Sequence, residues 1–122
     1  MQAIILRAGL ALALGTGAAL ADATQFEGRF ALDPASGLCI EGEGDVAGAA
    51  FRIEDGVFYG PVSECRMLNP TNIRDMRAVL FDFDCTGEGA RWQDRVLLML
   101  LDDGSLLRVV DGLAFADPPC PE

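Results

Sequence analysis

The sequence predicts an all-β fold, a small antiparallel sandwich or barrel of about six to eight strands with one short helix and two disulfides. Three observations support this prediction. Short runs alternate between apolar and polar residues, which is typical of half-buried strands. Turn pairs such as Asp55-Gly56 separate these runs. The chain of 122 residues is short for two domains, and its four cysteines can staple a thin core.

The first half of the chain begins with a strand at Phe26–Asp33 and a shorter one at Leu38–Ile40. The Gly-rich acidic stretch Glu41–Ala49 follows and is expected to be a loop. Residues 51–59 alternate on both sides of Asp55-Gly56. Because Asp-Gly tolerates the positive φ angles of a tight hairpin turn, this segment predicts a β-hairpin.

The middle of the chain contains the one predicted helix, about two turns from Asn69 to Met76. Asn69 suits the N-cap, and Pro70 suits the first helical position. Ile73 and Met76 lie three residues apart and would share a face. An α+β fold with a larger helical share around residues 67–76 is the alternative.

The second half predicts further strands. Ala78–Cys85 alternates most clearly, with Asp82 and Asp84 expected to face water. Arg91–Leu101 is the longest strand, and residues 102–105 form a turn. Leu106–Val110 returns, Asp111-Gly112 bulges or turns, and residues 113–115 continue before a Pro-rich tail.

Residues 1–21 are predicted to be a cleaved secretory signal, leaving residues 22–122 as a single disulfide-stapled β domain. Arg7 precedes an apolar run, and Ala19-Leu20-Ala21 offers the small residues that a signal peptidase reads. A membrane anchor is the alternative, but the run is shorter than the about 20 apolar residues of a spanning helix. The expected location is therefore periplasmic or secreted, without membrane attachment after cleavage.

Export favours disulfides for Cys39, Cys65, Cys85 and Cys120, because exported proteins meet an oxidising compartment. Their spacing does not match a zinc site, and the sequence contains no His to complete one. If Asp103-Gly104 turns a hairpin, Cys120 faces about position 87, near Cys85. We therefore expect Cys39–Cys65 and Cys85–Cys120, with the nested pairing Cys39–Cys120 and Cys65–Cys85 as the main alternative.

The composition excludes several chemistries. Without His or Lys, the chain has no imidazole base, no Schiff-base amine and no His-activated serine or cysteine nucleophile. Asp82, Asp84 and Gly87 match part of a calcium loop, but Gln93 stands where a bidentate Glu is needed. Paired loop carboxylates suggest glycosidase chemistry only weakly. We therefore predict no catalytic residue, no cofactor and no metal site.

The charge and the aromatic residues indicate a type of partner. Residues 22–122 contain 8 Arg and 19 acidic residues, a net charge of about −11. This charge repels nucleic acids and attracts cationic proteins. Tyr59 and Trp92, together with Phe58, are candidates for an aromatic contact surface, although core packing is the more common role of such residues. We expect a monomer.

The sequence resembles small four-cysteine periplasmic proteins of Alphaproteobacteria that have no assigned activity. The resemblance is carried by Cys39-Ile40, Glu64-Cys65-Arg66, residues 84–89, residues 103–106 and a final Cys. It implies no catalytic residue. Here the chain continues past Cys120 to Pro121-Glu122. In size, charge and cysteine usage, the chain is also similar to small β-barrel inhibitors exported by Gram-negative bacteria.

Together these observations predict a non-catalytic, exported, acidic β domain that acts as a binding or interaction module. One alternative is a periplasmic inhibitor of a cationic hydrolase such as a lysozyme or a protease. Another alternative is a carboxylate-dependent enzyme that acts on glycans.

Overall fold

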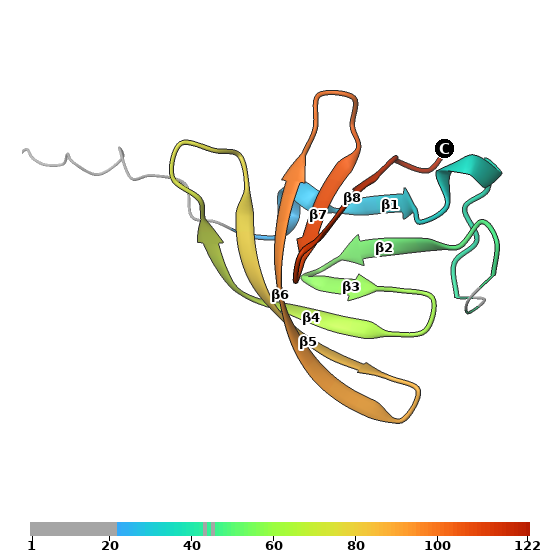
Figure 1. Ribbon diagram of the computed structural model, residues 1–122, viewed down its shortest axis with the longest axis horizontal. Coiled ribbons are helices and arrows are strands. Elements are labelled where there is room, and N and C mark those ends of the chain that lie inside the picture. Colours follow the sequence, from blue (N-terminus) through green and yellow to red (C-terminus); the bar gives the residue numbers. More distant parts are fainter. Residues whose placement is uncertain (1–21, 43, 45) are drawn as a thin grey trace, which may run out of the picture.

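Eight antiparallel strands follow one another along a single sheet in the computed structural model, which describes residues 22–42, 44 and 46–122. The sheet curls into a nearly closed barrel (Figure 1). The all-β prediction is therefore confirmed, while the predicted signal, residues 1–21, lies outside the described residues. The strands are β1 (Gly28–Ala31), β2 (Ala50–Glu54), β3 (Val57–Tyr59), β4 (Glu64–Asn72), β5 (Val79–Gly87), β6 (Ala90–Leu100), β7 (Leu106–Val110) and β8 (Leu113–Asp117).

Tight turns with two positive φ angles connect several of these strands. At Asp55-Gly56 the φ angles are 52° and 76°, and the flanking strands β2 and β3 pair in register across the turn. Glu88-Gly89 and Asp111-Gly112 show the same pattern. Both central residues of a type I′ turn need positive φ, which explains the acid–glycine pairs in the sequence. The predicted hairpin at residues 51–59 is confirmed.

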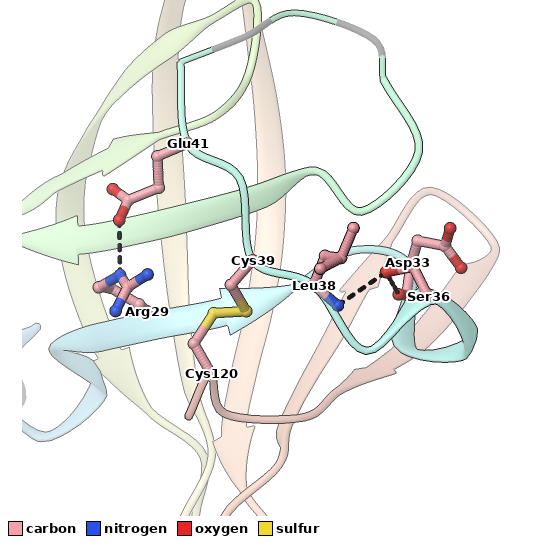
Figure 2. The surroundings of a disulfide bond; sticks show 7 residues. All are labelled: Arg29, Asp33, Ser36, Leu38, Cys39, Glu41 and Cys120. Carbon is pink, nitrogen blue, oxygen red and sulfur yellow. Dashed lines mark hydrogen bonds and ion pairs between the residues drawn. A yellow bond between two sulfur atoms is a disulfide. The ribbon is translucent and has the colours of Figure 1, made fainter. Parts of the chain in front are cut away.

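The C-terminal tail closes the barrel against β1 rather than against a full strand. The Ala31 amide donates to the Pro118 carbonyl (2.8 Å), and the Cys120 amide donates to the Arg29 carbonyl (2.9 Å). A disulfide joins Cys120 to Cys39 beside this contact (Figure 2). The predicted strand at residues 38–40 is reduced to an isolated bridge from Ile40 to Ala49. The closure therefore rests on two backbone hydrogen bonds and one covalent bond.

The barrel interior is a continuous chain of stacked and edge-on phenylalanine rings. Neighbouring ring centroids lie 4.6 to 6.4 Å apart, within the range of favourable aromatic contacts. The ring at one end of this chain, Phe26, comes from the 3₁₀ turn η3 (Thr24–Phe26) that precedes β1. This turn fills one end of the barrel. In order of contact, the rings are Phe30, Phe51, Phe58, Phe83, Phe81 and Phe26.

The predicted helix at residues 69–76 is wrong, because β4 continues to Asn72. Asn69 adopts φ 54°, and the register with β5 shifts between Leu68 and Thr71. Pro70 has no amide to donate and is tolerated at such a bulge. Met76 is 54 % exposed instead of packing inward, so the expected apolar helix face is missing. Residues 73–78 form a turn, and within the described residues helical structure is limited to 3₁₀ turns.

The preferred disulfide pairing is also wrong, and the nested alternative is present. Cys65 and Cys85 face each other across β4 and β5, with 4.0 Å between their Cα atoms, and Cys39 joins Cys120. The predicted turn at residues 103–104 is present, and it brings β6 and β7 together with Val96 opposite Val110. However, the chain turns again at residues 111–112, so the tail reaches β1 instead of Cys85. The sequence leaves Asp111-Gly112 open as a bulge or a turn, and the expected pairing of Cys120 with Cys85 does not include this second reversal.

Removing the disulfide at the closure is expected to destabilise the protein by about 4 kcal/mol, because it closes a long loop in the unfolded chain. Its sequence separation is 81 residues, against 20 for the other disulfide. In urea unfolding, the double variant Cys39→Ala/Cys120→Ala should lose this free energy of unfolding. It should also expose the Ala31 amide to hydrogen exchange.

The matched control is Cys65→Ala/Cys85→Ala, which should leave the Ala31 amide protected. Equal protection of this amide in both double variants would show that the disulfide does not hold the closure.

Candidate functional site

The two ends of the barrel differ in how they meet solvent. Successive strand connections alternate between the ends, so the described residues of the β1–β2 connection (32–42, 44 and 46–49) share one end with residues 60–63, 88–89 and 111–112. This end is called the mouth below. Of the seven large apolar side chains exposed in the described structure, only Met76 lies at the opposite end. The mouth is therefore the apolar end of the molecule. The other six are Leu38, Val46, Val62, Trp92, Leu113 and Phe115.

A cavity of about 270 Å³ opens at this end and is called the mouth cavity below. Phe58, Phe83 and the Cys65–Cys85 disulfide line it together with Val96 and Val110. Trp92, Leu113 and Phe115 surround it and are 38, 60 and 40 % exposed. The cavity therefore combines a buried aromatic lining with an apolar rim open to solvent.

Strand alternation explains why these side chains point inward. Trp92 on β6 pairs with the buried Cys85 on β5, so both lie on the inner face. Leu113 on β8 pairs with Val110 by the same rule. On the inner face, the level nearest the mouth holds the Cys65–Cys85 disulfide, which is smaller than the phenylalanine side chains deeper in the barrel. The interior is therefore filled at the η3 end and hollow at the mouth.

Arg108, which lines the cavity, belongs to a buried ion pair. Arg108 points inward from β7, and its Nε donates to Asp117 Oδ2 of β8 (2.8 Å). The two side chains are 14 and 5 % exposed. The Arg108 guanidinium also lies 4.4 Å from the centre of the Phe115 ring, in cation–π geometry. Asp117 therefore neutralises the charge of Arg108 and fixes the guanidinium that lies over the Phe115 ring.

One carboxylate at the rim orients the tryptophan. The indole Nε1 of Trp92 donates to Asp94 Oδ2 (3.1 Å), and both residues line the mouth cavity. Asp111 is exposed in the turn that precedes Leu113. With Arg108 paired to Asp117, the rim is acidic.

The two residues predicted as a contact surface lie on different faces of the sheet. Trp92 faces the mouth cavity, whereas Tyr59 lies on the outer face, with Arg52 at 4.2 Å from its ring centre. Phe58, grouped with them in the prediction, is buried in the core. The structure therefore does not join Tyr59 and Trp92 into one surface.

Asp82 and Asp84 lie on the outer face of β5 and are held by arginines. Arg66 Nη2 donates to Asp84 Oδ2 (2.6 Å), and Arg95 Nε donates to Asp82 Oδ1 (3.0 Å). The hydrogen bond from Arg66 lowers the pKa of Asp84, and the charges of Arg66 and Arg91 act in the same direction. Among the described residues, no group of three or more His, Cys, Asp or Glu side chains is placed to hold a metal ion.

The long β5–β6 hairpin packs closely against the loop at residues 60–63. A Cβ on Gly87 would lie 2.3 Å from the Val62 carbonyl oxygen, so only glycine fits there. Gly87 thus lets the loop come close enough for Ser63 to line the mouth cavity. A second hollow of about 530 Å³ lies beside this loop, but its lining of Leu32, Val46 and Pro61 among others contains no aromatic ring.

Comparison with known family models, curated proteins and solved structures finds no match. The resemblance stated above remains a prediction. Within the described part of the chain, no helix is long and apolar enough to cross a membrane.

Sequence reasoning did not single out Arg108, Leu113 and Phe115, which line the cavity, or Asp117, which pairs with Arg108. A signal for Arg108 was present, because it alternates with Leu106 and Val110 and so belongs to the inner face of its strand. The charge itself suggested a solvent-facing position. Its partner, Asp117, lies across the Asp111-Gly112 turn, which the sequence alone does not distinguish from a bulge.

The charged outer face predicts a pH effect on stability. Because the folded state lowers the pKa of Asp84, its stabilising effect is present above the unfolded value of about 3.9 and is lost as pH falls through the folded pKa. Asp84→Asn should therefore show a shallower loss of unfolding free energy between neutral and acidic pH. Urea unfolding at a series of pH values measures this slope, and identical slopes for both proteins would contradict the prediction.

Proposed function

We propose that the protein is an exported, non-catalytic binding module that holds an apolar group of its partner in the mouth cavity. The observation that carries this proposal is the set of exposed side chains Trp92, Leu113 and Phe115 around one concavity. Exposed apolar side chains that gather at a hollow mark interaction sites. Trp is also enriched among the residues that dominate binding energy.

The polar groups of the cavity support a binding role over a catalytic one. Asp94 accepts a hydrogen bond from Trp92, and Asp117 is paired with Arg108. A general acid or base needs a titratable group within reach of a substrate proton. Both carboxylates are engaged by neighbouring side chains, and the sequence offers no His.

The size and charge of the site favour a protein partner. A volume of about 270 Å³ lies below the roughly 300–1,000 Å³ of pockets for drug-sized ligands and suits a few side chains. The net charge of about −11 over residues 22–122 favours a cationic partner. Disulfides persist in oxidising compartments, which supports a periplasmic or secreted location.

A neutral apolar dye, N-phenyl-1-naphthylamine, should bind to the oxidised protein and quench Trp92. Since Trp92 is the only tryptophan, its emission reports on the mouth alone. The variant Leu113→Asp should weaken dye binding about tenfold, because it replaces an apolar wall by a charge. Fluorescence titration measures both effects.

Met76→Asp is the matched control, since Met76 is similarly exposed at the opposite end. It should bind the dye like the unmodified protein. Dye binding without quenching of Trp92, or equal weakening by both substitutions, would place the apolar site elsewhere and refute the proposal.

A further inference from the structure

We propose that the partner is an extended cationic peptide segment that pairs with the free edge of β8 and places an apolar side chain in the mouth cavity. This inference rests on the proposed function and names the partner class. Three observations carry it: an unpaired strand edge, a cavity next to that edge and an acidic rim.

One edge of β8 is unpaired because the segment that closes the barrel onto β1, residues 118–120, follows β8 in the chain and is not part of it. The tail pairs Pro119 with Phe30, and continuing this register would bring residues 32–36 beside residues 113–117. The chain leaves that path at Leu32, whose amide donates to the Ala49 carbonyl (2.9 Å). The 3₁₀ turn η4 (Pro34–Ser36) follows. Among the described strands, β8 therefore pairs with β7 alone.

The direction of the free backbone groups follows from the closure. In antiparallel strands, alternate residues direct both their N–H and their C=O to the same side. The Pro118 carbonyl and the Cys120 amide point to β1, so Ala114 and Ala116 direct their groups to the same open edge. Both alanines are exposed. Two residues with four backbone groups are thus available to an added strand.

The edge lacks the features that usually block strand addition. Residues 113–116 contain no Pro and no charged side chain, and Ala114 and Ala116 present only methyl groups. Natural edge strands are commonly protected by Lys, Pro or bulges. Leu113 and Phe115 of the same strand border the mouth cavity. A strand added here would direct alternate side chains toward that cavity.

Charge decides between the candidate occupants. Asp94 and Asp111 lie near this edge, and Asp117 neutralises Arg108 of the cavity. A second copy of the chain carries the same net charge of about −11 over residues 22–122, and repulsion between the two like-charged copies opposes self-pairing. A segment that alternates Lys or Arg with apolar residues would pair with the edge and direct its apolar side chains into the cavity. Its positive charge would complement the acidic net charge of the protein.

The test measures the binding of a capped peptide, Lys-Val-Lys-Leu-Lys-Val-Lys, to the oxidised protein. Calorimetry gives the affinity, and Trp92 fluorescence reports on the mouth cavity. We expect binding that changes the Trp92 emission and weakens with added salt. The peptide with Glu in place of Lys should not bind. A peptide methylated at alternate backbone amides should bind about tenfold more weakly, because it loses hydrogen bonds to the edge.

The protein variant is Ala114→Pro, which removes an amide from the free edge without removing a bond to β7. It should weaken binding about tenfold, whereas the matched variant Ala114→Ser should not. If Ala114→Pro does not fold, the methylated peptide tests the same hydrogen bonds on the unmodified protein.

Binding that is unaffected by backbone methylation, or that leaves Trp92 unchanged, would overturn the inference. A dimer in light scattering that Ala114→Pro dissolves would assign the edge to a second copy and overturn it as well. If the neutral dye binds but the peptide does not, the strand addition is wrong and the proposed function stands. If neither binds, both are wrong.

Discussion

The closure of the barrel by its C-terminal tail is the constraint on which the rest of the structure depends. β1 has only four residues and gains its outer partner from residues 118–120, held by two backbone hydrogen bonds and the Cys39–Cys120 disulfide. Burial of the phenylalanine chain requires this closure, because Phe30 of β1 begins that chain. Surface charge does not replace this closure as a source of stability, because surface ion pairs contribute little and the excess of acidic side chains is self-repelling.

The same closure creates the candidate site. Because the tail, and not β8, meets β1, the first part of β8 keeps a free edge at the mouth. The small Cys65–Cys85 disulfide replaces bulky side chains at this level and leaves the mouth cavity. The inward-facing Leu113 and Phe115 therefore remain exposed. The core and the proposed binding surface are thus two parts of one inner face.

The sequence predicted the parts that depend on local rules. Alternation located the strands, and the acid–glycine pair at Asp55-Gly56 located a hairpin. Local rules failed at Asn69-Pro70, where helix-capping residues serve a bulge between paired strands. They also failed for the disulfides, since the pairing depends on where the tail meets β1. The mouth cavity is formed by strands that are distant in sequence, so no single motif predicts it.

The central claim is that β8 has one paired edge and one free edge, and amide hydrogen exchange of the oxidised protein tests it most directly. The account predicts slow exchange at Phe115, whose amide faces β7, and at Ala31, whose amide donates to the tail. It predicts fast exchange at Ala114 and Ala116. Slow exchange at both alanines in the monomer would show that another segment covers this edge and would contradict the account.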